Sequence, residues 1–497
     1  MANHASPKKM TRQLINVVWF KRDLRLSDHA ALHAACEQNL PILLLYIVEP
    51  SLVDDAHYSL RHWRFIWQSL QQLDQQLMGK KGNVVVIEGE APAVFEQLQQ
   101  HYQIDTVFSH QEIGLNITYD RDKALHKKFK HQQISWNEFP QGAVIRAANS
   151  RDDWDKHWQQ VMRQPLLETN WQHVDFITEL QLPHFTPPAE WQQTDMLFQY
   201  GGELTAHKVL AEFFAKRGKL YNRQISSPDL SRQSCSRMSP YLAWGNISLR
   251  QVYQQLLHHW NDPGWRRALA ALSSRLHWHC HFMQKFESET EMEFRPVNQG
   301  YQSFPWRQDK QSEFDLIAWQ NGKTGYPLVD ASMRCLNATG YINFRMRAML
   351  VSFLCHQLHI DWRRGTYHLA RVFLDFEPGI HYPQLQMQAG VMGTNTIRIY
   401  NPTKQAEEQD PEGKFIREWL PELSDLPNEI IHRPWEVTPM EEMMLNFQLG
   451  RDYPYPIVDI KVTSKHSRDK LWSWRKREDV QRENHRILRR HVRLTRH

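Results

Sequence analysis

Ionisable and amide side chains gather in the stretch DFEPGIHYPQLQMQ, residues 375–388. Asp375 and Glu377 supply two carboxylates, and His381 supplies an imidazole, a group that titrates near neutral pH. The Pro-Gly pair between them predicts a turn. A run of uncharged side chains then follows where a surface loop usually carries charge: Gln384, Gln386, Met387 and Gln388. Such groups suit the wall of a cofactor pocket, but an irregular buried loop is an equally good interpretation.

The residues before this turn predict the helix that positions it. Leu369, Val372 and Phe373 recur at helical spacing in the segment that begins at Trp362. This spacing gives the segment one apolar face, as expected of a helix packed on a core.

Two other motifs do not support the chemistry that they suggest. Gly322-Lys323-Thr324 matches the end of a phosphate-binding loop, but Ile317 stands where the first glycine is required and no strand is expected before it.

His277, His279 and His281 could suggest a metal site. On a helix the first and third share a face and the second points elsewhere, so polar packing is a better interpretation than zinc.

The composition describes a soluble globular protein with more than one domain. The chain has 497 residues, of which 41% are hydrophobic, and a mean hydropathy of −0.64. Its start, MANHASPKKMTRQL, is polar and basic without the apolar core of a signal peptide, and no apolar run is long enough to span a membrane. We therefore expect a cytoplasmic protein.

The cysteines are dispersed and form no CxxC pair: Cys36, Cys235, Cys280, Cys335 and Cys355. This pattern indicates reduced thiols. It does not suit an iron–sulfur cluster, whose cysteine ligands often occur as close pairs.

The net charge of +5 is unevenly distributed. Residues 461–497 hold 13 Lys/Arg and 4 Asp/Glu, a net charge of +9, which leaves −4 for the rest of the chain. This basic end also carries Trp472 and Trp474, and it could bind the phosphates of a nucleic acid. A solvated terminal helix or a disordered end explains it equally well.

Apolar runs alternate with helical segments over residues 12–140. Near-continuous hydrophobic strands are expected at Ile15–Phe20, Leu40–Ile47, Asn83–Ile87 and Thr106–Ser109. Helices are expected over Ser27–Gln38, with Ser27 as the N-cap, and around His62–Met78. The alternation predicts an α/β domain, a Rossmann-like parallel sheet with helices on both faces.

The rest of the chain has a different character. Residues 141–200 are rich in Pro, Gln and Trp and predict an ordered inter-domain connector. Residues 201–497 predict an all-α domain that ends in the basic tail. Its helices are expected over Leu204–Lys216, Ser248–His259, Trp265–Phe286, Phe314–Asn321, Leu328–Leu336 and Ile342–His359.

Five segments resemble the photolyase/cryptochrome family of blue-light flavoproteins, and they follow the family's order from about residue 15 to about residue 460. They are VVWFKRDLRLSDHAAL, CSRMSPYLAWGNIS, WQNGKTGYPLVDASMRCLNATGY, IDWRRG and RIYNPTKQAEEQDPEGKFIREWLPEL. The resemblance implies an N-terminal antenna domain, a connector and a helical domain that binds FAD, which agrees with the organisation expected from the residues.

The resemblance also implies the FAD-binding residues. Tyr221 matches a tyrosine beside the FAD phosphates, and Cys235-Ser236-Arg237-Met238-Ser239 matches a Thr-Ser-x-x-Ser stretch that holds the diphosphate. Cys235 replaces the threonine, so one good hydrogen-bond donor is lost. Arg347 matches an arginine that pairs with an aspartate under the flavin ring, here Asp375, and Glu377 replaces a second aspartate.

Two further positions, His381 and Glu112, each have two interpretations. His381 stands where photolyases usually have Asn and plant cryptochromes have Asp, near flavin N5. A histidine there could deliver a proton near neutral pH, and a ring turned away from the flavin is an equally good alternative. Glu112 lies near a family glutamate that contacts a folate antenna chromophore. The antenna varies in the family between folate and flavin types, so a surface carboxylate explains Glu112 nearly as well.

The residues that contact damaged DNA depart from the family. In its Glu-x-x-Trp motif, Arg275 replaces the glutamate, and Trp278 is kept. Phe344, Ala348 and Met387 stand in place of an Asn, a Met and a Trp that touch the lesion. One of these five contacts is therefore retained.

The tryptophans that carry electrons to FAD are also altered. Trp362 matches the middle one, but Leu385 stands in place of the one nearest the flavin. Trp278, Tyr341 or Tyr382 would have to replace it.

From the resemblance we expect a deoxyribodipyrimidine photolyase, a monomer that binds UV-damaged DNA and splits pyrimidine dimers by electron transfer from reduced FAD. The alternative is a cryptochrome-type photoreceptor without repair activity, which the altered lesion contacts and His381 favour. A light-insensitive FAD-binding protein is a third possibility.

Overall fold

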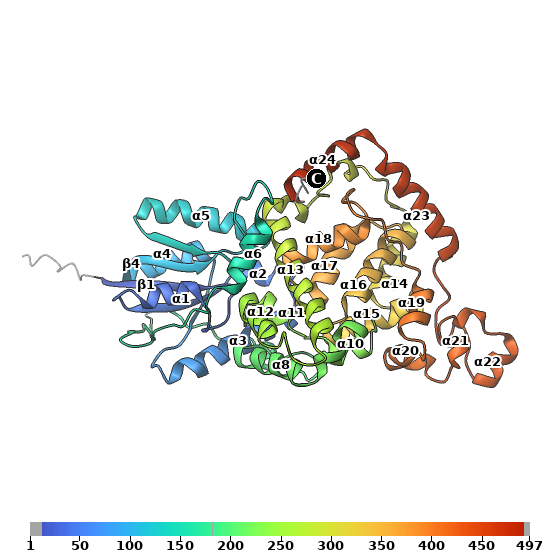
Figure 1. The fold of residues 1–497 in the computed structure, drawn as a ribbon, viewed down its shortest axis with the longest axis horizontal. Helices are drawn as coiled ribbons and strands as arrows, with labels where there is room; N and C mark the ends of the chain where they lie inside the picture. The colour runs from blue at the N-terminus through green and yellow to red at the C-terminus, as the bar shows by residue number, and fades with distance from the viewer. Residues whose placement is uncertain (1–11, 181, 492–497) are drawn as a thin grey trace, which may run out of the picture.

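The structure is a computed structural model, and it describes residues 12–180 and 182–491. Residues 1–11 of the basic start and the last six residues of the basic tail lie outside the described residues. Figure 1 shows the sheet domain at one end of the molecule and the larger helical domain at the other, with the connector helix α6 (Trp154–Arg163) at their junction.

A five-stranded parallel sheet forms the centre of the N-terminal domain, in the order β3-β2-β1-β4-β5. Its strands are β1 (Gln13–Phe20), β2 (Ile42–Val48), β3 (Val85–Glu88), β4 (Tyr102–His110) and β5 (Ser135–Phe139). Every residue of β2 is buried, as a sheet covered on both faces requires. Along β1, Ile15, Val17 and Trp19 belong to one hydrophobic core, and Val18 and Phe20 belong to the other. The prediction of a doubly covered parallel sheet is confirmed.

Helices cover both faces of the sheet: α1 (Ala30–Cys36), α2 (Pro50–Val53), α3 (Leu60–Met78), α4 (Ala91–His101) and α5 (Asn116–Gln132). The prediction of Ser27 as N-cap is wrong. Helix α1 is capped by His29, whose Nδ1 accepts the N–H of Leu32 at 3.0 Å. Ser27 instead hydrogen-bonds Glu203 of the helical domain through its N–H and its hydroxyl.

The connector adds α7 (Ala189–Gln192) to α6, and all helices after it belong to the second domain. They are α8 (Glu203–Ala215), α9 (Tyr221–Gln224), α10 (Leu230–Ser234), α11 (Ser239–Ala243), α12 (Leu249–His258), α13 (Arg266–Ser288), α14 (Lys310–Gln320), α15 (Pro327–Thr339), α16 (Phe344–Ser352), α17 (Trp362–Val372), α18 (Pro378–Ala389), α19 (Pro402–Gln409), α20 (Lys414–Trp419), α21 (Asn428–Ile431), α22 (Pro439–Leu445), α23 (Ile460–Arg475) and α24 (Glu478–His491). Among the described residues, no helix is both long and apolar enough to cross a membrane.

The basic end of the chain is helical over residues 460–491, so a disordered end is wrong for this part. Helices α23 and α24 lie across one side of the helical domain in Figure 1. Trp474 is structural: its ring packs on Phe304 at 5.3 Å, and its Nε1 donates to the carbonyl of Gly300. Trp472 is 46% exposed and remains available for contacts outside the molecule.

Residues 378–389 form the helix α18, and the interpretation of this run as an irregular loop is wrong. Pro378 lies in the first turn, where no N–H is needed. Pro383 lies inside the helix and lacks one N–H donor. The two prolines and a glycine made the sequence look like a turn, but α18 packs along α13 in the core and is stabilised by that packing.

Arg22 at the end of the β1 segment joins the two domains. Its Nη1 donates to the carbonyls of Ala243 at 3.2 Å and Phe376 at 3.0 Å, and its Nη2 donates to the hydroxyl of Tyr58 at 3.1 Å. Its guanidinium also lies 4.3 Å from the centre of the Trp244 ring. The backbone between Asp375 and Glu377 is therefore held by the sheet domain.

The Gly322-Lys323-Thr324 motif is part of a structural turn before α15. The carboxylate of Asp330 accepts from Thr324 N and Oγ1 at 2.8 and 2.6 Å, from Gly325 N at 3.0 Å and from the hydroxyl of Tyr453 at 2.5 Å. Asp330 is fully buried, and this burial raises its pKa to about 6 in spite of the donors.

Replacing Asp330 with Ala would leave four buried donors without their acceptor. We expect Asp330→Ala to lower the free energy of unfolding by about 3 kcal/mol or more, measured by urea denaturation. Asp425→Ala at an exposed site serves as the control, with an expected change within about 0.5 kcal/mol. Equal losses in the two variants would show that Asp330 does not hold this turn.

Candidate functional site

Asp375, on the turn that precedes α18, forms an ion pair with Arg347 of α16. Arg347 Nη2 donates to Asp375 Oδ2 at 2.6 Å, and the guanidinium also lies 3.9 Å from the centre of the Phe373 ring. Asp375 Oδ1 is buried and has no hydrogen-bond partner among the described residues. A buried carboxylate oxygen without a donor is a site for an N–H group of a ligand.

Glu377 has a different partner, His279 on α13. Glu377 is 4% exposed, and its Oε2 lies 3.0 Å from His279 Nε2. Burial lowers the pKa of His279, but the charge of Glu377 outweighs this effect and the pKa rises to about 10. His279 is therefore protonated at neutral pH. His277 pairs with Asp155 instead, so the histidines of this helix do not share one site.

A small cavity of about 40 Å³ lies against this turn. Helix α18 presents His381, Gln384, Leu385 and Gln388 to it at helical spacing. Met387 is not part of its lining, because its position on α18 directs it to another side. Met387 therefore lies apart from Gln384 and Gln388, its neighbours in the same run of uncharged side chains.

A second cavity of about 820 Å³ lies between the two domains. The sheet domain contributes Asp23, Arg25 and His110, and the helical domain contributes His279 and Glu377. Glu377 lines both cavities, so the ion pair with His279 forms part of the wall between them.

The surroundings of His381 favour a neutral ring near neutral pH. Burial lowers the pKa of His381 to about 3, and the nearby positive charge of Arg347 acts in the same direction. Its Nε2 lies 3.1 Å from the carbonyl of Thr366, a contact that requires a proton on Nε2. The ring is therefore neutral, and Nδ1 is the nitrogen that can accept a hydrogen bond.

The stretch from Cys235 to Ser239 precedes and opens the short helix α11. Cys235 and Met238 are buried and Ser236 is half-buried. Arg237 has the left-handed φ of 61°, and its guanidinium lies 3.7 Å from the centre of the Tyr341 ring. This stretch is not part of the lining of the small cavity against the turn.

Tyr221 and Cys235 form part of one polar cluster. Burial raises the pKa of Cys235 to about 11, although a hydrogen bond with Tyr341 opposes this. Tyr221 is hydrogen-bonded to Arg275, the residue that replaces the family glutamate. Arg275 is thereby linked to the expected phosphate site as well as to the surface of α13.

Two large aromatic side chains of the helical domain are exposed. Trp278 is 45% exposed on α13, with its ring 5.1 Å from His281 and 5.6 Å from Phe282. Phe344 is 39% exposed and also lines the small cavity. Such exposed rings can stack on the bases of a nucleic acid.

Trp362 is completely buried and lies beside Tyr382, with ring centres 6.4 Å apart. Tyr382 in turn lies 5.5 Å from His381. Of the aromatic residues considered as replacements at Leu385, Tyr382 is the one with a ring contact to Trp362 among the described residues.

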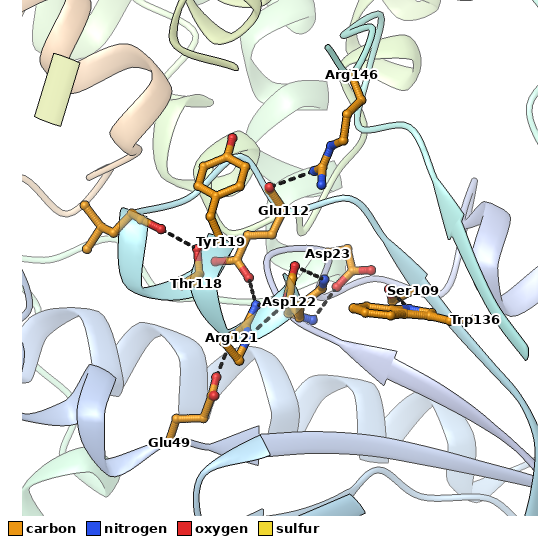
Figure 2. A network of polar contacts seen from close by, with 12 residues as sticks. Asp23, Glu49, Ser109, Glu112, Thr118, Tyr119, Arg121, Asp122, Trp136 and Arg146 are labelled. Carbon is orange, nitrogen blue, oxygen red and sulfur yellow. Dashed lines mark hydrogen bonds and ion pairs between the residues drawn. The ribbon is translucent and has the colours of Figure 1, made fainter. Parts of the chain in front are cut away.

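Glu112 is buried, so its interpretation as a surface carboxylate is wrong. Figure 2 shows its carboxylate beside Arg121, which also binds Glu49 and Asp122. The Arg121 to Glu112 distance is 2.6 Å, and Glu112 is 6% exposed. An antenna molecule that binds Glu112 would have to share it with Arg121.

Asp23, His29 and His110 have the geometry of a metal-ligand cluster, but the contacts of the two imidazoles with the Asp23 carboxylate explain it. Asp23 Oδ2 lies 3.0 Å from His29 Nε2 and 2.7 Å from His110 Nδ1. His29 Nδ1 already accepts the N–H of Leu32, so Nε2 must carry the proton and cannot bind a metal ion.

Sequence reasoning did not find Arg22 or His279 as residues of the site. The basic KRDLR segment contains Arg22, but nothing in it points to residue 376 in another domain. The signal for His279 is its helical spacing, which sets it apart from His277 and His281.

The residues of the turn fit the chemistry of a flavin. The free oxygen of Asp375 can accept a ring N–H, and the Arg347 guanidinium can stabilise negative charge on a reduced ring. The cavity holds on the order of one to three water molecules, so its walls must separate when a tricyclic ring binds.

Comparison with known proteins identifies both domains. Residues 16–164 match the DNA photolyase family, and residues 271–473 match the FAD binding domain of DNA photolyase. The chain is 28% identical over 471 residues to a cryptochrome DASH of Synechocystis sp., covering 89% of this chain and 95% of the relative. It is also 28% identical over 469 residues to a deoxyribodipyrimidine photo-lyase of Vibrio cholerae, covering 90% and 97%.

Solved structures also superpose on this chain over nearly its whole length. The Synechocystis sp. cryptochrome superposes with a TM-score of 0.83 at 28% identity, covering 92% of this chain and 99% of that one. A class III photolyase from Agrobacterium tumefaciens superposes with a TM-score of 0.81 at 26% identity, covering 95% and 100%. The chain therefore belongs to the photolyase/cryptochrome family of blue-light flavoproteins and has the FAD-binding domain of that family.

Proposed function

We propose that this protein is a cytoplasmic, monomeric deoxyribodipyrimidine photolyase that splits pyrimidine dimers in UV-damaged DNA. The observation that carries the proposal is the Arg347–Asp375 pair with its free buried oxygen, in a cavity bordered by the exposed ring of Phe344. The five free cysteines suit a reducing compartment.

In this proposal the chain holds the cofactor and admits a flipped-out lesion. Arg347 and Asp375 hold the flavin ring, and residues 235–239 with Tyr221 hold the phosphates. When bound and reduced, FAD supplies the electron for dimer cleavage on absorption of blue light. Trp278 and Phe344 pack against bases that have left the stack, a step favoured by the weakened pairing of a dimer. Arg275 contributes positive charge for phosphates, whose binding weakens as salt rises.

A cryptochrome-type photoreceptor without repair activity is the second candidate. Arg275 in place of a glutamate and Met387 outside the cavity lining favour it, because two expected lesion contacts are then missing. Relatives named cryptochrome DASH and photo-lyase are equally similar to this chain.

The deciding experiment illuminates chemically reduced protein with oligonucleotides that each contain one defined lesion, in single and double strands. The photolyase proposal requires restoration of a cyclobutane dimer or a (6-4) photoproduct. If neither lesion is restored while FAD is bound and reduced, the photoreceptor is the better assignment.

Trp278 provides a test of the lesion contact. We expect Trp278→Ala to weaken binding of lesion DNA by about 1–3 kcal/mol, roughly 5- to 150-fold, because one stacking ring is lost. Binding is measured by fluorescence anisotropy, and Phe314→Ala is the control, because Phe314 on α14 is an exposed aromatic ring outside the basic end of the chain. Unchanged affinity and repair in Trp278→Ala would remove Trp278 from the lesion site.

His381 provides a test that needs no activity. Since its pKa is lowered to about 3, we expect its ring resonances to stay constant between about pH 5 and pH 8. The measurement is an NMR titration of ¹³C-labelled histidine, with His381→Asn to assign the signal and the surface histidines as internal reference. A midpoint within this range would restore His381 as a candidate proton donor.

A further inference from the structure

Tyr382 is hydrogen-bonded to a base that belongs to the other domain. Its hydroxyl lies 2.5 Å from His57 Nε2, and His57 Nδ1 lies 2.6 Å from Asp55 Oδ1. Tyr382 and His57 are 1% and 3% exposed. Tyr382 belongs to α18, whereas Asp55 and His57 belong to the loop between α2 and α3 of the sheet domain.

The hydrogen bonds fix which atom carries each proton. The carboxylate of Asp55 can only accept from His57 Nδ1–H, which leaves the lone pair of Nε2 to accept from the Tyr382 hydroxyl. Burial opposes ionisation of Asp55, but its bonds from His57 hold its pKa below the usual range. The imidazole is thus an oriented base with a negative charge behind it, ready to become an imidazolium.

The ring of His57 is also fixed by packing. It stacks on Phe376 with ring centres 5.4 Å apart and planes 14° apart, and Tyr367 contacts it edge-on at 4.7 Å. Phe376 is the residue whose carbonyl Arg22 binds. The base therefore has one orientation relative to the flavin turn.

Tyr382 adjoins Trp362, the tryptophan of the expected electron route that this chain retains. It contacts Trp362 on one side and His381 on the other, with ring centres 6.4 and 5.5 Å apart. Leu385 occupies the position of the tryptophan nearest the flavin and cannot be oxidised. Burial raises the pKa of Tyr382 well above its ordinary value, so the phenol keeps its proton until it is oxidised.

We propose that Tyr382 is a redox-active tyrosine that re-reduces Trp362 during light-driven reduction of bound FAD, and that it passes its phenolic proton to His57. Bound FAD would supply the light-driven electron acceptor, and Trp362 would be the first donor. One electron then moves from Tyr382 to the oxidised Trp362, which returns to its neutral closed-shell form. The O–H bond of Tyr382 breaks and the N–H bond of His57 Nε2 forms. The products are a neutral tyrosyl radical and an imidazolium paired with Asp55.

Transfer of the phenolic proton to His57 lengthens the lifetime of the charge-separated state. A tyrosyl radical that has lost its proton can take the electron back only if His57 returns the proton at the same time. This role does not depend on whether the protein repairs DNA, because it concerns reduction of the flavin before any substrate is used.

The test is flash photolysis of the FAD-loaded protein, followed by transient absorption and by EPR. Wild type is expected to form a tyrosyl radical more slowly in deuterated buffer than in water. Tyr382→Phe is expected to abolish this radical and to shorten the charge-separated lifetime at least tenfold. His57→Gln keeps a hydrogen-bond acceptor but not a base, and it is expected to slow radical formation at least tenfold. Tyr301→Phe, at another buried tyrosine, is the matched control and should behave as wild type.

A second readout needs no flavin. The proton between Tyr382 and His57 should give a downfield NMR resonance that disappears in Tyr382→Phe and persists in Tyr301→Phe, which also reports that the variants are folded. An undiminished tyrosyl radical in Tyr382→Phe, or unchanged kinetics in His57→Gln, would overturn the proposal. The repair assay on chemically reduced wild type bypasses this step, so failure of the relay and failure of the photolyase proposal give different results.

Discussion

The buried guanidinium of Arg22 is the contact on which the flavin turn depends. It is 7% exposed, and it binds the carbonyl of Phe376 from the sheet domain. A buried arginine must be matched by acceptors, because an unpaired charge in the interior is costly. The hydroxyl of Tyr58 and two carbonyls provide them, together with the face of Trp244. The sheet domain therefore fixes the backbone between Asp375 and Glu377 in addition to its own fold.

The charged side chains around the turn form two ion pairs, and Asp375 Oδ1 remains without a hydrogen-bond partner among the described residues. Arg347 pairs with Asp375 and His279 pairs with Glu377, while His381 is neutral. A ligand in the small cavity thus meets little net charge but a guanidinium and a free carboxylate oxygen at fixed places. This arrangement binds a ring with both donors and acceptors better than it binds a simple ion.

Sequence patterns predicted the strands and helices whose packing against the core is regular. The buried strands of the sheet and the amphipathic helices have periodicities that are visible in a single sequence, whereas β5 is short and half-exposed and has no such signal. The partner of Asp375 followed from the family resemblance. The bond from Arg22 to residue 376 and that from His57 to Tyr382 join residues more than 300 positions apart, so they were visible only in the folded chain.

Helix α18 shows why one run of similar residues has several roles. Gln384 and Gln388 face the cavity, while Gln386 is completely buried and binds backbone groups of Met292, Arg295 and Val297. Neighbouring side chains on a helix point 100° apart, so their tasks differ even where their chemistry is alike. Of the four residues that depart from the family at the expected lesion contact, Ala348 is buried and Met387 is half-buried, whereas Arg275 and Phe344 are exposed. Core packing places little constraint on them, and they can differ between a repair enzyme and a photoreceptor while the flavin site and the fold stay the same.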